Sequence, residues 1–350
     1  MAEMLINQTM STTKRTHFQV PSLPAFRTMN YRRNYVKILN SLNGSVQIEE
    51  ASRNLKVAYQ GAPGAYSEFA AKTACPESVT IPCRAVINVI SAIETGRADL
   101  AILAVESTME GTAVRNYDLL LQRDLCIVQE INLFVQYCLL AMPGVTKSEL
   151  KRVISHPMAL AHCGRSLAEL GLDHEAVDDT AGAVELLLSN RMLDTAAIAS
   201  TRAAALYGLD VLAHGLQDES WNVTRFLILS KNNPKIAKKR KIRVKTSMVV
   251  AHHSGTLDVL LKVLSTFSSR KISLTKLEVN SSIDNNGPVK VLDAHEGGSV
   301  KEYPSVLYVD FEGSIDDQKV KDAIAELSKL PVYVRILGCY SADPTIYGLQ

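Results

Sequence analysis

Short apolar runs rich in β-branched residues alternate along this chain with longer stretches of helical spacing. The first run is Leu55–Tyr59, and a turn at Gln60–Gly64 separates it from a helix that opens at Ser67. Similar runs recur at Leu100–Val105, Leu125–Val128, Arg152–Ile154 and Thr195–Ala199. Because strands that alternate with helices pair into a sheet with helices on its faces, the pattern predicts an α/β fold across residues 53–230.

A second pattern occupies residues 246–350. A strand at Ser247–Ala251 precedes a helix whose apolar face repeats every 3.6 residues from Leu257 to Phe267. The remaining elements are strands at 272–279 and 306–311, a helix at 314–327 and a last strand at 332–337. This β-α-β-β-α-β order is ferredoxin-like. Two copies can share the free edges of such a sheet, so we expect a homodimer or a higher homo-oligomer.

Two basic segments flank the α/β region. Residues 231–245 carry Lys and Arg without any acid, and the lack of aromatic residues for base stacking favours a linker over a nucleic-acid patch. Residues 1–52 are rich in Ser, Thr and basic residues, and Glu3 is the only acid before Glu49. This composition predicts an organellar transit segment, with a disordered extension as the alternative.

The overall composition points to a small-molecule partner. Lys and Arg number 38 against 36 for Asp and Glu, so no strong field attracts nucleic acid or a membrane surface. The apolar run Ile131–Met142 is interrupted by polar residues and falls short of the roughly 20 residues of a membrane span. The 6 cysteines contain no C-x-x-C pair, which argues against a metal site.

Polar residues stand at the start of one apolar strand, in the run Asn222–Phe226. Adjacent strand residues point to opposite faces, so either one of Thr224 and Arg225 faces a cleft while the other fixes the local backbone, or a bend brings both to a ligand. Arg225 suits either a ligand carboxylate or a structural pair with an acid.

The run occurs together with four further motifs, and the combination resembles the plant arogenate and prephenate dehydratases. These motifs are Ala58–Gly61, Arg115–Leu120, Ser155–Pro157 and Asp178–Ala183. The resemblance covers about residues 55–229 for the catalytic domain and 246–340 for a domain similar to the family's ACT regulatory module. It implies a two-lobed catalytic body similar to type II periplasmic binding proteins, a homo-oligomer built on dimers, and a location in the plastid stroma.

The resemblance also implies a reaction. Arogenate, or prephenate as a second candidate substrate, loses its ring carboxylate and ring hydroxyl to give phenylalanine or phenylpyruvate, without a metal or organic cofactor. Thr224 would assist the leaving hydroxyl, Arg225 would hold a carboxylate, and Phe226 would pack under the strand.

Further site residues follow from the same resemblance. The implied substrate-binding residues are Glu106, Ser107, Thr108, Ser155, Thr180 and Ser200. Thr180 and Ser200 are equally suited to capping a helix. The implied phenylalanine-effector site comprises Gly255, Thr256, Leu257, Leu277 and Glu278.

Three motifs depart from the family pattern. Ser107 replaces the asparagine of Pro-Ile-Glu-Asn, Met158 replaces the glutamine after Ser-His-Pro, and Glu278–Ser281 replaces Glu-Ser-Arg-Pro. Two polar cleft groups and an effector-site cation are thereby lost. A second hypothesis is therefore a catalytically impaired paralogue that acts as an amino-acid-binding or regulatory protein.

Overall fold

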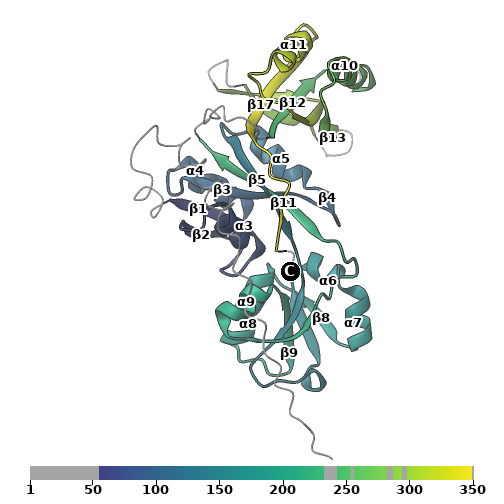
Figure 1. The fold of residues 1–350 in the computed structure, drawn as a ribbon. Coiled ribbons are helices and arrows are strands. Elements are labelled where there is room, and N and C mark those ends of the chain that lie inside the picture. Colours follow the sequence, from purple (N-terminus) through teal and green to yellow (C-terminus); the bar gives the residue numbers. More distant parts are fainter. Residues whose placement is uncertain (1–54, 232–242, 254–255, 282–286, 294–297, 349–350) are drawn as a thin grey trace, which may run out of the picture.

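The structure, a computed structural model, describes residues 55–231, 243–253, 256–281, 287–293 and 298–348 (Figure 1). The predicted transit segment 1–52, most of the predicted linker 231–245 and Gly255 lie outside these ranges. No helix in the described ranges is long and apolar enough to cross a membrane.

The first sheet is mixed and has seven strands. Six follow the order β18-β5-β11-β3-β1-β2, and β4 pairs with β3. The strands are β1 (Lys56–Gln60), β2 (Val79–Cys83), β3 (Leu100–Ser107), β4 (Gly111–Thr112), β5 (Cys126–Phe134), β11 (Val223–Ser230) and β18 (Ile346–Tyr347). Its helices are α3 (Tyr66–Ala74), α4 (Val86–Glu94) and α5 (Val114–Leu121). β11 lies antiparallel between β3 and β5 at the centre of this sheet.

The second sheet has five strands in the order β10-β6-β9-β7-β8. The strands are β6 (Cys138–Ala141), β7 (Arg152–Ser155), β8 (Asp173–Ala176), β9 (Thr195–Ala199) and β10 (Asp210–His214). Its helices are η1 (Lys147–Glu149), α6 (Pro157–Ala161), α7 (Gly164–Leu170), α8 (Thr180–Ser189) and α9 (Thr201–Tyr207). The chain crosses between the two sheets twice, and the crossings are bonded to each other through Val135 N–H to Asn222 O at 2.8 Å.

The third sheet is antiparallel, with the order β13-β16-β12-β17. The strands are β12 (Val244–His252), β13 (Leu274–Ser281), β16 (Ser305–Glu312) and β17 (Val332–Ser341), with helices α10 (Thr256–Ser269) and α11 (Gln318–Leu327). A hairpin of β14 (Val289–Asp293) and β15 (Ser299–Tyr303) is inserted before β16. The helices cover the outer face of this sheet, and the other face packs on the first sheet (Figure 1).

The predicted α/β class is confirmed, but several short strands, such as β2, β8, β10 and the β14–β15 hairpin, were not predicted, and some predicted elements differ at their ends. The last helix begins at Gln318 instead of Ser314, because Ser314 N–H bonds to the Asp317 carboxylate in a turn at 2.9 Å. β18 falls within the range expected for the C-terminal domain, yet it pairs with β5 of the first sheet. A two-residue strand has too little periodicity to be read from sequence.

An apolar core joins the first and third sheets. Val249, Tyr308 and Leu337 of the third sheet belong to the same buried cluster as Ile127 and Leu227 of the first. At Gly338 the two backbones approach closely, because a Cβ there would lie 2.2 Å from the carbonyl oxygen of Ile127. Only glycine fits this position without moving one sheet away from the other.

We therefore expect Gly338→Ala to destabilise the protein by about 3 kcal/mol, since the added methyl group meets rigid backbone. The measurement is the free energy of unfolding in urea. Gly164→Ala is the matched control, because the nearest atom to its new Cβ is an Asp218 oxygen at 3.6 Å. Equal stability of the two variants would contradict close docking of the sheets.

Candidate functional site

β11 carries the predicted catalytic residues between β3 and β5. Thr224 pairs with Ser107 on one side and with Leu133 on the other. Its side chain is half-buried, and no hydrogen bond of its hydroxyl to another described residue is present. Phe226 is buried in the apolar cluster that contains Tyr59, consistent with a packing role. The hydroxyl of Thr224 is therefore available to a ligand.

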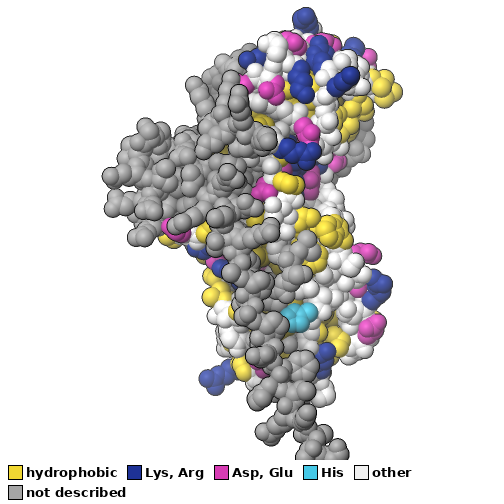
Figure 2. All heavy atoms as spheres, viewed as in Figure 1, with side chains coloured by type: hydrophobic (Ala, Val, Ile, Leu, Met, Phe, Trp, Pro, Cys, Tyr) yellow, Lys and Arg dark blue, Asp and Glu magenta, His cyan; other side chains and the backbone are white. Residues whose placement is uncertain are grey.

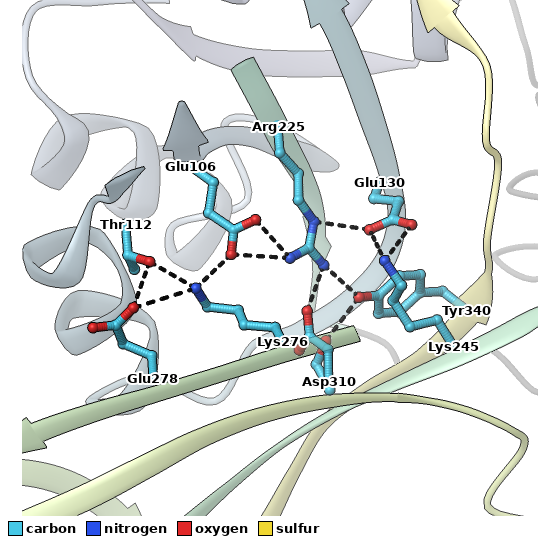
Figure 3. Close-up of polar contacts among 10 residues, drawn as sticks. Glu106, Thr112, Glu130, Arg225, Lys245, Lys276, Glu278, Asp310 and Tyr340 are labelled. Atoms are coloured by element: carbon cyan, nitrogen blue, oxygen red, sulfur yellow. Dashed lines mark hydrogen bonds and ion pairs between the residues drawn. The ribbon is translucent and has the colours of Figure 1, made fainter. Parts of the chain in front are cut away.

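Arg225 points toward the third sheet, away from Thr224, as strand alternation requires (Figure 3). Its Nε donates to Glu130 at 2.8 Å, and its Nη1 lies 3.3 Å from both oxygens of Glu106. Its Nη2 donates to the Tyr340 hydroxyl at 2.9 Å and lies 2.7 Å from Asp310 Oδ2, an ion-pair contact without hydrogen-bond alignment. All three guanidinium nitrogens of Arg225 thus contact acceptors within the protein. In the sequence, this guanidinium is a candidate binding group for a substrate carboxylate.

This group of side chains, here named the interdomain charge cluster, is largely buried. It comprises Glu106, Glu130, Arg225, Lys245, Lys276, Asp310 and Tyr340. Burial works to raise the pKa of Glu106, but Arg225 and Lys276 outweigh it and hold that pKa below its usual value. Glu130 is 3% exposed and also accepts from Lys245 at 2.8 Å. Buried charges of this kind persist only when each has partners.

The residues after Glu106 tie β3 to the start of β11. The Thr108 hydroxyl donates to Trp221 O at 2.9 Å and accepts from Val223 N–H at 3.0 Å. Ser107 Oγ accepts from Met109 N–H at 3.2 Å. Of the predicted substrate-binding residues in this segment, Ser107 and Thr108 therefore lie beside Thr224, whereas the Glu106 carboxylate lies in the interdomain charge cluster.

The predicted residues of the second sheet occupy helix starts and a strand end. Ser155 is fully buried, and its hydroxyl donates to Ile198 O at 2.7 Å. Thr180 is the first residue of α8, directly after the N-cap Asp179. Ser200 is the N-cap of α9, and its hydroxyl also donates to Gly64 O at 2.9 Å. Ser200 thus joins the second sheet to the turn that follows β1.

A cleft lies between the turn at 60–64 and the start of α8. A pocket of about 680 Å³ opens there, lined among others by Gly61, Pro63, Arg84, Asp179 and Gly182. Gly64 approaches α9 so closely that a Cβ would lie 3.0 Å from Ala203 Cα, and its φ of +91° also favours glycine. The turn therefore brings β1 of the first sheet close to α9 beside the second sheet.

Sequence reasoning missed a polar contact between the segment after β3 and the segment after α6. Glu110, after β3, contacts Nε2 of His162, which follows α6. Nδ1 of His162 and Nδ2 of Asn222 are buried without a hydrogen-bond partner among the described residues. Such atoms are uncommon in native proteins and are candidates for ligand contact. No sequence signal relates His162 to Glu110, because they are 52 residues apart.

Some of the predicted effector residues are exposed to solvent, and one contacts the short strand β4. The side chains of Leu257 and Leu277 are 68% and 38% exposed, whereas Glu278 accepts from the Thr112 hydroxyl at 2.7 Å. Thr256 opens α10, and Gly255 is not described. In the described ranges no three His, Cys, Asp or Glu side chains gather as a metal-binding group.

The chain is similar to known proteins in both sequence and fold. A family model described as prephenate dehydratase matches residues 57–234. The chain is 49% identical over 294 residues to arogenate dehydratase/prephenate dehydratase 6, chloroplastic, of Arabidopsis thaliana, covering 83% of this chain and 70% of the relative. The solved prephenate dehydratase from Arthrobacter aurescens in complex with L-Phe is 26% identical, with a TM-score of 0.70 over 83% of this chain and 92% of that chain. A structure titled a novel type of quorum quenching acylases is 32% identical, with a TM-score of 0.69 over 83% of this chain and 98% of that chain.

The interdomain charge cluster generates a stability prediction. Arg225→Gln leaves the carboxylates of Glu130 and Asp310 buried with too little positive charge, so we expect a loss of about 3–5 kcal/mol in the free energy of unfolding. Arg243→Gln is the control, because its pair with Glu312 at 3.1 Å has side chains that are 70% and 41% exposed. That variant should lose less than about 1 kcal/mol. Similar losses in both variants would show that the cluster contributes little.

Proposed function

Because the chain belongs to the prephenate dehydratase family, we propose that it is an arogenate dehydratase, a carbon–oxygen lyase that also accepts prephenate. One observation supports the chemistry: the Thr224 hydroxyl lies beside Ser107 at the half-buried end of a central strand, without a hydrogen-bond partner among the described residues. Identity of 49% to an Arabidopsis thaliana enzyme named for both dehydrations supports the enzymatic proposal over the non-catalytic alternative.

The reaction needs positioning more than covalent chemistry. The bond between the ring and its carboxylate breaks, and its electron pair enters the ring as carbon dioxide leaves. The bond to the ring hydroxyl breaks at the same time, its electron pair leaves with the oxygen, and that oxygen takes a proton, supplied ultimately by the solvent, to become water. Thr224 donates a hydrogen bond to that oxygen as negative charge develops, which is the moment when a fixed donor stabilises the transition state most. The ring becomes aromatic, and no metal or organic cofactor enters these steps.

The predicted site residues fall into two roles in this proposal. Ser107, Thr108 and Thr180 contact the substrate, because their side chains are at least partly exposed, the first two next to Thr224 and the third at the start of α8. The buried hydroxyls of Ser155 and Ser200 bond to backbone and therefore position the second lobe. Glu106 and Arg225 likewise position β3 and β11 through the interdomain charge cluster.

The third sheet has the features of an ACT regulatory domain that dimerises and binds phenylalanine. β13 is an edge strand, and Leu277 and Val279 on it are 38% and 39% exposed. Leu257 and Leu261 of α10 are also exposed, and Figure 2 shows hydrophobic side chains gathered over this end of the molecule. An apolar patch beside a free strand edge suits a second copy of the chain. The solved relative bound to L-Phe supports phenylalanine as the effector.

We place the mature enzyme in the plastid stroma. The Arabidopsis thaliana relative is named chloroplastic, and residues 1–52 combine basic and hydroxyl side chains with few acids. The domain division follows the same proposal. The catalytic domain comprises residues 53–230, the basic linker residues 231–245, and the ACT regulatory domain residues 246–350.

The first test is turnover of arogenate and prephenate by the purified protein, followed by the absorbance of the aromatic product. Thr224→Ala should lower kcat by about 10²- to 10³-fold, as loss of one transition-state donor does elsewhere. Thr224→Ser should retain part of the activity, because it keeps the hydroxyl. Thr275→Ala, at an exposed position of β13, is the control. No turnover of either substrate by the unaltered protein would refute the proposed function.

The second test concerns the dimer. Leu277→Glu combined with Val279→Glu puts charge on the exposed face of β13, so we expect the protein to become a monomer in sedimentation or light scattering. Val300→Glu is the control, because Val300 is 49% exposed on the β14–β15 hairpin of the same domain. A double variant that remains dimeric would exclude this patch as the interface.

A further inference from the structure

β13 presents different chemistry on its two faces. Leu277 and Val279 are exposed, whereas the alternate residues Lys276, Glu278 and Asn280 contact β3, β4 and α5, respectively. Asn280 donates to the Asp118 carboxylate of α5 at 3.0 Å. The inner face of β13 is therefore bonded to the catalytic body, although the strand belongs to the third sheet.

Lys276 makes several polar contacts from this face of β13 (Figure 3). Its Nζ lies 2.5 Å from Glu106 Oε1 and donates to the Thr112 hydroxyl at 2.7 Å. It also lies 3.7 Å from Glu278 and 5.4 Å from the centre of the Tyr117 ring. Only 8% of the lysine side chain is exposed, so these contacts form in a low-dielectric setting where they are strong.

The two closest partners of Lys276 lie on the two strands that flank one turn, the β3–β4 turn. Glu106 of β3 and Thr112 of β4 face each other, and Ser107 pairs with Gly111 one step nearer the tip. β4 has only two residues, too few to hold the turn by backbone pairing alone. At the tip, Glu110 contacts His162 of the second lobe.

We propose that Lys276 is a positioning residue for the reaction assigned above: it clamps the β3–β4 turn so that Ser107 stays beside Thr224. The kinetic part of this inference rests on the proposed function. Lys276 acts through Glu106 and Thr112. Without the charge of Lys276, Glu106 keeps its two 3.3 Å contacts to Arg225 as its remaining side-chain contacts among the described residues, and Thr112 of the short strand β4 loses its bond to the lysine.

The test is Lys276→Met, which keeps the length of the side chain and removes its charge. We expect kcat for arogenate to fall by about 10- to 100-fold, because small displacements of positioned groups cost this much. We also expect faster hydrogen–deuterium exchange in the peptide that spans residues 107–112. Lys276→Arg should retain most of the activity, since the guanidinium group can still reach both Glu106 of β3 and Thr112 of β4.

Arg335→Met is the matched comparison. Arg335 is also a buried cation of the third sheet, and its Nη1 donates to Leu121 O at the end of α5 at 2.7 Å, away from the turn. It should lose similar stability while kcat changes by less than about twofold and exchange at 107–112 stays unchanged. Combining Lys276→Met with Glu106→Gln should lower kcat no further than the more impaired single variant, as expected for two residues that act as a unit.

Two outcomes separate the inference from the proposed function. If the unaltered protein is active and Lys276→Met matches Arg335→Met in both kcat and exchange, Lys276 holds the domains together and nothing more, and the inference is overturned. If the unaltered protein turns over neither substrate, the proposed function fails. Exchange at residues 107–112 then still decides whether Lys276 fixes the turn.

Discussion

A guanidinium enclosed by carboxylates from three strands is the contact on which the arrangement of this protein depends. Arg225 of β11 meets Glu106 of β3, Glu130 of β5 and Asp310 of β16. Removing these charges from water is expensive, so the strands must keep the register and the docking that pair them. The same register sets Thr224 on the opposite face of β11, where a ligand can reach it.

The third sheet is therefore structural support for the catalytic body as well as a candidate regulatory domain. Its inner face contributes apolar residues to a shared core, and Gly338 allows the sheet to lie directly on the backbone of β5. Its edge strand β13 bonds to the turn beside Thr224 on one face and exposes leucine and valine on the other. A ligand or a second copy bound to the outer face would thus act on the same strand that holds the turn.

The departures from the family pattern now have places in the structure. Ser107, which replaces an asparagine, pairs with Thr224 and accepts a hydrogen bond from Met109 N–H, so a small polar group remains at this position. Met158, which replaces a glutamine, is 36% exposed near the start of α6. The loss of the arginine and proline after Glu278 leaves a strand whose inner residues bond to the catalytic body instead.

Local patterns in the sequence determined the α/β class and the alternating strands and helices, because each depends on residues within a few positions of one another. The orientations of Thr224 and Arg225 and the partners of Arg225 were decided only by the tertiary structure. Arg225 meets Glu106 across 119 residues, and Lys276 meets Thr112 across 164. Ion pairs and hydrogen bonds between distant segments leave no periodic trace in the chain, and neither does a two-residue strand such as β18. The sequence alone allowed two roles for Arg225, binding of a substrate carboxylate or an ion pair with acidic residues. Only the folded structure shows which acidic residues surround its guanidinium group.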